Sequence, residues 1–121
     1  ETCNRLSEHS ILLKVDLPAD VVAAGINKLA ALIEVETMLV DMGCGRVLAG
    51  IEELASESWP KIGEAIDALG GHATLEVAPP EFKAENDVFG LEQSCWKLMH
   101  RVKKAMDPHG IFAPGRMPGR V

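Results

Sequence analysis

Apolar residues alternate with polar ones in two separate stretches of the chain. Over Ser10–Leu17 every odd-numbered position is apolar and most even-numbered positions are polar, with Leu12 as the exception. A two-residue period of this kind predicts a β-strand with one buried face. The same period returns over His72–Val77, where the inward positions are Ala73, Leu75 and Val77.

Three other stretches carry apolar residues at helical spacing. Ala19–Ile33 predicts a core-facing helix. A second helix is predicted to begin at a serine cap, Ser56 or Ser58, and to stop at Gly70-Gly71. Leu91–Met106 predicts a third helix, and its apolar face is formed by Leu91, Cys95, Leu98, Met99, Val102 and Met106.

The segments between these elements complete the predicted fold. Val35–Met42 and Arg46–Ile51 are rich in strand-forming residues and surround Gly43-Cys44-Gly45, so they predict two strands joined by a tight turn. Ala78–Gly90 predicts a polar loop, and Ile111–Val121, with two Pro-Gly steps, an irregular tail. The order βαββαβ, followed by a helix and a tail, predicts a ferredoxin-like α+β fold, whose antiparallel sheet carries both helices on one face.

The ferredoxin-like order makes the first and fourth strands neighbours. Their outward residues then share the open face of the sheet, and these are Lys14, Asp16, His72, Thr74 and Glu76. Histidine exchanges protons near neutral pH and lysine can hold a carboxylate, so this face is a candidate substrate surface with His72 as its proton-transfer residue. A solvated sheet face accounts for the same residues without any function.

Composition and charge limit the partners. The 121 residues are 47% apolar, which is enough for one domain with a single core. The net charge is −6, and the nearest approach to a basic surface is Arg101, Lys103 and Lys104 on one helix, so no nucleic acid partner is expected. No apolar run approaches the ~20 residues that span a bilayer, so no transmembrane segment is expected.

Cysteines and histidines indicate no metal site. Cys3, Cys44 and Cys95 are far apart and lack metal-ligand spacing, as do the four histidines. Reduced thiols are typical of a cytoplasmic protein. Glu1–Ser10 is polar, so no signal peptide is expected, and a start at Glu1 rather than at methionine suggests a processed or excised chain.

The most specific feature is the run KKAMDPHGIFAPGRM, from Lys103 to Met117. It resembles the C-terminal signature of FAD-linked oxidases of the vanillyl-alcohol-oxidase type, which commonly reads K-x-x-x-D-P-x-G-I-x-N-P-G-K/R. The GGHATL segment, Gly70–Leu75, looks like the FAD-binding smaller subunit of bacterial glycolate oxidase. Two departures are that Ala113 stands where the family usually has Asn, and that the H-x-G-D-G-N-x-H motif of related chains is absent.

The resemblance implies that residues 1–121 are a single C-terminal domain of a larger flavoprotein oxidoreductase that oxidises a small organic acid, such as glycolate or another 2-hydroxy acid. Its open sheet face is then expected to cover the flavin ring. The FAD-binding domain of the same polypeptide and further oxidase subunits are the expected partners. Because the FAD-binding domain is absent from these residues, the chain alone is expected neither to retain FAD nor to turn over substrate. The implied flavin-proximal residues are Gly110, Ile111, Pro114, Gly115 and Arg116.

Two non-enzymatic interpretations stay open at this point. The chain can be a free-standing ferredoxin-like binding or regulatory module that dimerises through its sheet, or a structural subunit that docks a flavin partner. Leu12 and Leu48 are expected on the open face, and exposed apolar patches tend to find partners. A homo-oligomer through this face is therefore expected as well.

Overall fold

The computed structural model describes residues 9–120, and the predictions made for the start of the chain and for Cys3 lie outside them. The chain divides into two compact units, one that ends at Gly90 and one that begins at Leu91. The first unit contains the sheet and its helices, and the second contains the last long helix and the tail.

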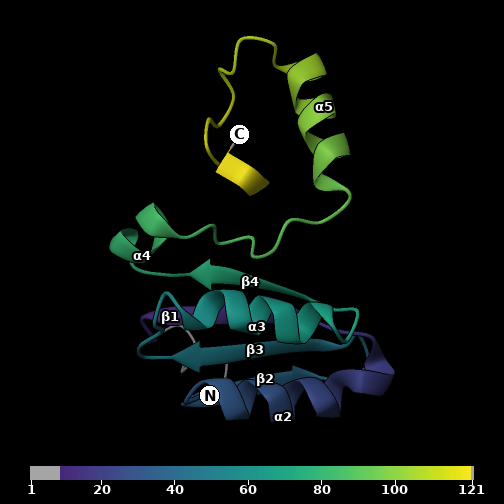
Figure 1. Cartoon of the computed structure of the whole chain (residues 1–121), viewed down its shortest axis with the longest axis vertical. Helices are drawn as coiled ribbons and strands as arrows, with labels where there is room; N and C mark the ends of the chain where they lie inside the picture. Colours follow the sequence, from purple (N-terminus) through teal and green to yellow (C-terminus); the bar gives the residue numbers. More distant parts are fainter. Residues whose placement is uncertain (1–8, 121) are drawn as a thin grey trace. The chain divides into compact units, whose positions relative to one another are not determined.

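The first unit is built on a four-stranded antiparallel sheet in the order β2-β3-β1-β4 (Figure 1). The strands are β1 (Ile11–Asp16), β2 (Thr37–Asp41), β3 (Arg46–Ile51) and β4 (His72–Val77). This order confirms the predicted ferredoxin-like fold and the antiparallel pairing of the first and fourth strands. The fourth strand has the predicted bounds, because its period-two pattern is bounded by glycines on one side and prolines on the other.

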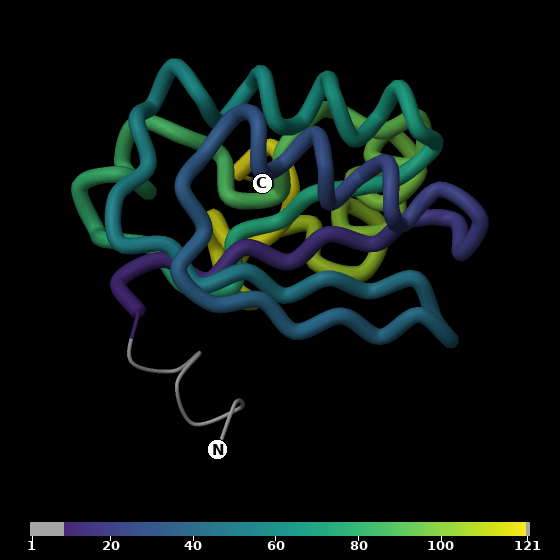
Figure 2. Tube along the Cα trace, turned by 90° about the horizontal axis from the view of Figure 1, so that it is seen from below, coloured from purple at the N-terminus to yellow at the C-terminus, as the bar shows by residue number. Residues whose placement is uncertain are grey.

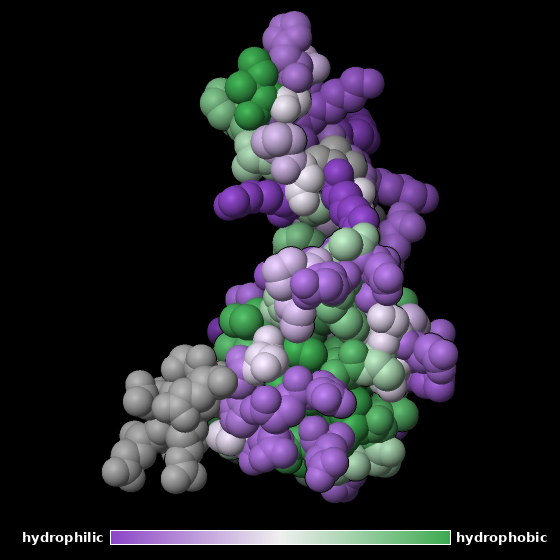
Figure 3. Space-filling view, turned by 90° about the vertical axis from the view of Figure 1, so that its left-hand side faces the viewer, coloured by the Kyte–Doolittle hydropathy of each residue, from purple (hydrophilic) through white to green (hydrophobic). Residues whose placement is uncertain are grey.

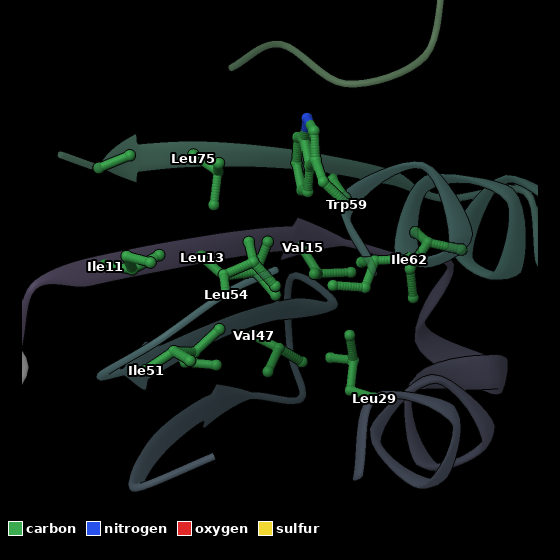
Figure 4. Packing of buried hydrophobic residues seen from close by; sticks show 14 of the residues in the cluster. Ile11, Leu13, Val15, Leu29, Val47, Ile51, Leu54, Trp59, Ile62 and Leu75 are labelled. Atoms are coloured by element: carbon green, nitrogen blue, oxygen red, sulfur yellow. The ribbon is translucent and has the colours of Figure 1, made fainter. Parts of the chain in front are cut away.

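Both main helices cover the same face of the sheet, as predicted (Figure 2). They are α2 (Val22–Leu32), preceded by the short 3-10 turn η1 (Ala19–Val21), and α3 (Ser58–Asp67). Leu29 of α2 and Ile62 of α3 are fully buried and point toward Val15 and Val47 of the sheet (Figure 4). Burying one such side chain contributes about 1.5–3 kcal/mol, so this single layer of contacts supplies most of the unit's hydrophobic stabilisation.

Leu17, just after β1, packs closely against α2 and against the turn before β4. A Cβ atom on Gly25 of α2 would lie 2.3 Å from Leu17 Cδ1, and one on Gly71 would lie 2.5 Å from Leu17 Cδ2. Glycine in a helix costs about 1 kcal/mol relative to alanine. The close contact with the buried Leu17 side chain accounts for that glycine in α2.

The end of the first unit differs from the sequence prediction. The predicted polar loop Ala78–Gly90 contains a short helix, α4 (Pro80–Glu85), whose Phe82 is buried. The Pro79-Pro80 pair indicated a loop, but a proline is also favoured in the first turn of a helix. Val77, predicted to face inward, is 46% exposed because the β1–β4 register shifts at Leu12, and such an irregularity reverses the alternation.

The predicted serine caps are wrong in detail. Helix α3 begins after Glu57, and no side chain caps its first turn. Its first turn instead contributes Trp59, which is 4% exposed and whose Nε1 donates a hydrogen bond to the Asp87 carbonyl at 2.8 Å. An anchoring tryptophan therefore fixes the start of this helix where a capping serine was expected.

The turn between β2 and β3 gives the first prediction. Only Gly45, and not Gly43, has a positive φ (+71°), and a Cβ atom on it would lie 1.9 Å from the Leu17 carbonyl oxygen. We expect Gly45→Ala to lower the free energy of unfolding by more than about 2 kcal/mol, because neither the φ angle nor the backbone oxygen can adjust cheaply. Urea unfolding followed by far-ultraviolet circular dichroism measures this loss.

Gly43→Ala is the matched control in the same turn. A Cβ there would meet only the flexible Asp41 side chain, at 3.3 Å from Oδ1, so we expect a change of about 0.5 kcal/mol or less. Equal losses for the two variants would contradict the role given to the Leu17 contact.

Candidate functional site

The open face of the sheet collects the polar residues that the sequence predicts there. Strand pairing places Lys14 beside Thr74 and Asp16 beside His72 across the β1–β4 ladder. On the other side of β1, Lys14 is opposite Leu48 and Asp16 is opposite Arg46. The alternation of β1 and β4 thus brings the predicted set onto one face, whose middle strands also carry apolar side chains.

The charged groups of this face are paired with one another. Lys14 Nζ lies 2.5 Å from Glu76 Oε1, and Arg46 Nε donates a hydrogen bond to Asp16 Oδ1 at 2.6 Å. The hydrogen bond and the charge of Asp16 raise the pKa of Arg46. A carboxylate ligand could compete with Glu76 for Lys14, because such exposed pairs are worth only about 0–1 kcal/mol.

The first half of β4 presents two polar groups on the open face, His72 and Thr74. His72 is half-buried, and its ring has no hydrogen bond or ion pair within residues 9–120. Thr74 Oγ1 is buried and also lacks a hydrogen-bond partner in that range. A buried hydroxyl without a partner is costly, so this position favours a polar ligand atom.

A second histidine lies on the same face, and the sequence pattern missed it. The His9 ring lies over Gly50, where a Cβ atom would come within 2.2 Å of its Cδ2. Nδ1 of His9 contacts Glu52 at 2.7 Å, and Nε2 contacts Thr37 Oγ1 at 3.1 Å. His9 thus covers one end of the open face as a structural group, and the unexplained Gly50 inside β3 was the only signal for it.

The C-terminal unit is organised by helix α5 (Trp96–Met106) and one buried carboxylate. Asp107 directly follows the helix and is 7% exposed, the one buried charged side chain in residues 9–120. Its Oδ1 accepts the Ile111 N–H and its Oδ2 the Phe112 N–H, each at 2.9 Å. Lys103 Nζ donates to the same carboxylate and to the Phe112 carbonyl oxygen. This network fixes the turn that follows α5.

These contacts set the charge state of Asp107. The hydrogen bond from Lys103, followed by the two backbone N–H groups, lowers its pKa from 3.8 to about 2, although burial acts in the opposite direction. The sequence pattern predicted that the third helix ends at Met106 and indicated no partner for Asp107. A lysine four residues before the aspartate, one helical turn away, is the signal that points to the ion pair.

The tail residues expected beside a flavin are all exposed, and they lie in the unit that begins at Leu91, whereas His72 lies in the sheet unit. Gly110 and Gly115 have φ angles of +64° and +71° and would meet no atom within 4 Å of an added Cβ. Ala113 also has a positive φ, of 44°. The end of the tail returns to the helix, because His100 Nε2 contacts the Pro118 carbonyl oxygen at 2.6 Å, at the start of the 3-10 turn η2 (Pro118–Arg120).

Helix α5 departs from the prediction in two ways. It begins at Trp96 rather than at Leu91, because a bend and a turn precede it. Its predicted apolar face is exposed: Leu98 by 60%, Val102 by 49% and Met106 by 79%. Helical spacing identified which side chains form the apolar face, but it did not show that this face is exposed. That face borders a hollow of about 570 Å³, which is lined by Leu98, Met99, Val102, Lys103, Met106, Asp107, Phe112 and Met117.

Comparison of the chain with protein-family models, with curated proteins and with solved structures gave no match. Within residues 9–120, no three histidine, cysteine or acidic side chains are grouped so as to hold a metal ion. None of the helices in the same range has the length and apolar character that crossing a membrane requires.

The buried carboxylate gives the second prediction. A lowered carboxylate pKa means that the contribution of Asp107 to stability is complete above its ordinary pKa of 3.8 and is lost as the pH falls through about 2. We expect the Ile111 and Phe112 amide chemical shifts to titrate with a midpoint near pH 2. Two-dimensional NMR over an acid titration measures it.

Two variants test the cause. Lys103→Met is expected to raise the midpoint, since the Lys103 hydrogen bond is the largest cause of the low pKa. Lys104→Met removes the same charge from an exposed neighbour and is expected to leave the midpoint unchanged. A wild-type midpoint near 3.8 would contradict the network.

Proposed function

We propose that this chain is the C-terminal domain of an FAD-dependent oxidoreductase that oxidises a small organic acid, glycolate or another 2-hydroxy acid. The observation that carries this proposal is the network around Asp107. This network joins three residues of the oxidase-like signature, Lys103, Asp107 and Ile111. In addition, the Gly110 N–H donates a hydrogen bond to the Asp107 carbonyl oxygen at 3.1 Å. A simple helix stop does not require these residues together.

The conformation of Ala113 supports the same resemblance. This position departs from the signature, which usually has Asn there, and its φ is +44°. Asparagine tolerates the left-handed region better than alanine does, because its side chain can bond to nearby backbone. The backbone of this tail is therefore one that the asparagine of the signature fits.

The exposed tail suits one wall of a flavin site. Gly110 and Gly115 leave open space beside the backbone, and the exposed Ile111 offers an apolar contact to a ring. Arg116 is exposed and can offset anionic charge. Because an FAD-sized ligand usually has most of its surface buried, the FAD-binding domain of the same polypeptide must supply the remaining walls. Bound FAD would accept the hydride from the carbinol carbon of the acid.

On the open sheet face, the residues of this chain have separable tasks. His72, whose ring has no partner in the described part of the chain, takes the hydroxyl proton of the substrate. Lys14 binds the substrate carboxylate in exchange for Glu76, 2.5 Å away. Thr74 Oγ1 is buried without a hydrogen-bond partner in the described part of the chain, and it provides a further hydrogen bond to the acid once the side chains over it move aside.

A second candidate function is a binding or regulatory module that dimerises through the open face. It is favoured by Leu12, Leu39 and Leu48, which are half-exposed on neighbouring strands of that face. The coding sequence upstream of Glu1 discriminates between the two functions. A few hundred residues with a glycine-rich FAD-binding pattern would favour the oxidase, whereas an initiator codon just upstream would favour the module.

The third prediction concerns flavin binding and turnover. The chain alone is expected to elute from gel filtration without visible flavin absorbance, and the protein that includes the FAD-binding domain is expected to be yellow. In that complete protein, His72→Asn should lower kcat by about a hundredfold or more on the preferred 2-hydroxy acid, while flavin absorbance stays unchanged.

His109→Asn is the control, since His109 is exposed and is given no role in the reaction. Its kcat should equal that of the wild type. Flavin retained by the chain alone, or full activity of the His72 variant, would contradict the proposal.

The fourth prediction tests association through the open face. We expect light scattering to show self-association of the chain at high concentration, and Leu12→Lys to reduce it because a charge enters the half-exposed apolar patch. Leu32→Lys is the matched control on helix α2, which covers the opposite face, and should leave association unchanged. A wild-type chain that stays monomeric would argue against this interface.

A further inference from the structure

The apolar face of α5 borders a concave surface. The hollow beside it has a volume of about 570 Å³, and most of its lining is apolar, from α5 and from Phe112 and Met117 of the tail. Met99, Met106 and Met117 are three of the five methionines of the chain. Methionine side chains are flexible and polarizable, and they are common at surfaces that adapt to varied apolar partners.

The charge of the chain is divided unevenly between its two units. Leu91–Val121 contains six lysine and arginine residues and two acidic residues, a net charge of +4. The preceding residues contain six basic and sixteen acidic ones, a net charge of −10, which together give the −6 of the whole chain. Asp107, one of the two acidic residues of the C-terminal unit, is paired with Lys103.

Basic side chains border the apolar face directly. A second hollow on α5, of about 510 Å³, is lined by the apolar Leu98 and Val102 together with Arg101 and Lys104. Figure 3 shows strongly hydrophilic surface next to apolar surface on the C-terminal unit, in the upper part of the view. A ligand that contacts Leu98 and Val102 therefore also meets the cations of Arg101 and Lys104. Complementary charge at the edge of a binding surface favours an acidic partner.

We propose that this groove binds an amphipathic helical segment of a partner protein whose apolar side chains are flanked by glutamate or aspartate. Helix-in-groove recognition uses anchors one turn apart, and the groove offers apolar walls from Leu98 to Met106 along two turns of α5. The proposal goes beyond the oxidase function and does not depend on it.

The shape of the groove favours a protein segment over a membrane surface. Helices that lie on anionic bilayers insert a convex apolar face between lipid headgroups. Here the apolar side chains border a hollow that also contains the Lys103–Asp107 pair, which cannot enter lipid without a large desolvation cost.

A synthetic peptide tests the proposal on the full chain. The first probe is a fluorescein-labelled helical peptide of about 18 residues with leucine on one face and glutamate on the others. A second, comparison peptide has lysine in place of every glutamate. Fluorescence anisotropy should show saturable binding of the acidic peptide, at least about tenfold tighter than that of the basic one, and weakened by added salt.

Met106→Asn should weaken binding of the acidic peptide by about tenfold or more, because it replaces an apolar side chain of the groove with a polar one and leaves the net charge unchanged. Met42→Asn is the matched control, since Met42 is also exposed, by 57%, but lies in the β2–β3 turn. Equal binding of both peptides, or equal effects of the two substitutions, would overturn the proposal. Binding to vesicles of phosphatidylglycerol and phosphatidylcholine in preference to the acidic peptide would overturn it in favour of a membrane surface.

Discussion

The fold depends on the burial of one face of a four-stranded sheet under two helices. Leu29 of α2 and Ile62 of α3 meet Val15 and Val47, and these contacts exclude water from a single layer. Both helices pack against this face, so neither covers the opposite face of the sheet. The outward-pointing residues of the strands lie on that opposite face. The same constraint that stabilises the first unit thus leaves Lys14, Asp16, His72, Thr74 and Glu76 on the face that the helices do not cover.

The C-terminal unit meets a different physical demand. It is too short to enclose an apolar core of its own, since surface grows relative to volume as a unit becomes smaller. A buried carboxylate stabilises the turn after α5 instead. Asp107 accepts hydrogen bonds from two backbone N–H groups and from the Lys103 ammonium. The apolar face of α5 stays exposed, and the signature residues after Asp107 are presented on a defined backbone.

The oxidase proposal and the groove proposal both use surfaces that the internal packing leaves exposed. The oxidase proposal assigns the open sheet face to a small acid and the exposed tail to one wall of the flavin site. The groove proposal assigns the apolar side of α5 to an acidic helix. In each case the neighbouring charges decide the class of ligand: the Lys14–Glu76 pair can exchange for a substrate carboxylate, and the basic residues of α5 favour an acidic partner.

The amino-acid sequence by itself determined the order of the four strands and the two helices of the βαββαβ pattern, and the inward residues of β1 and most of those of β4, because a two-residue period places alternate side chains on opposite sides whatever they contact. It also placed His72 and Lys14 on one face, since the ferredoxin-like order makes their strands neighbours. Tertiary structure alone decided that Val77 is exposed, that Lys14 is paired with Glu76, that His9 covers Gly50, and that the apolar face of α5 is left open. These outcomes depend on contacts between residues distant in sequence, and a local pattern records the polarity of a side chain but not the neighbour it will meet.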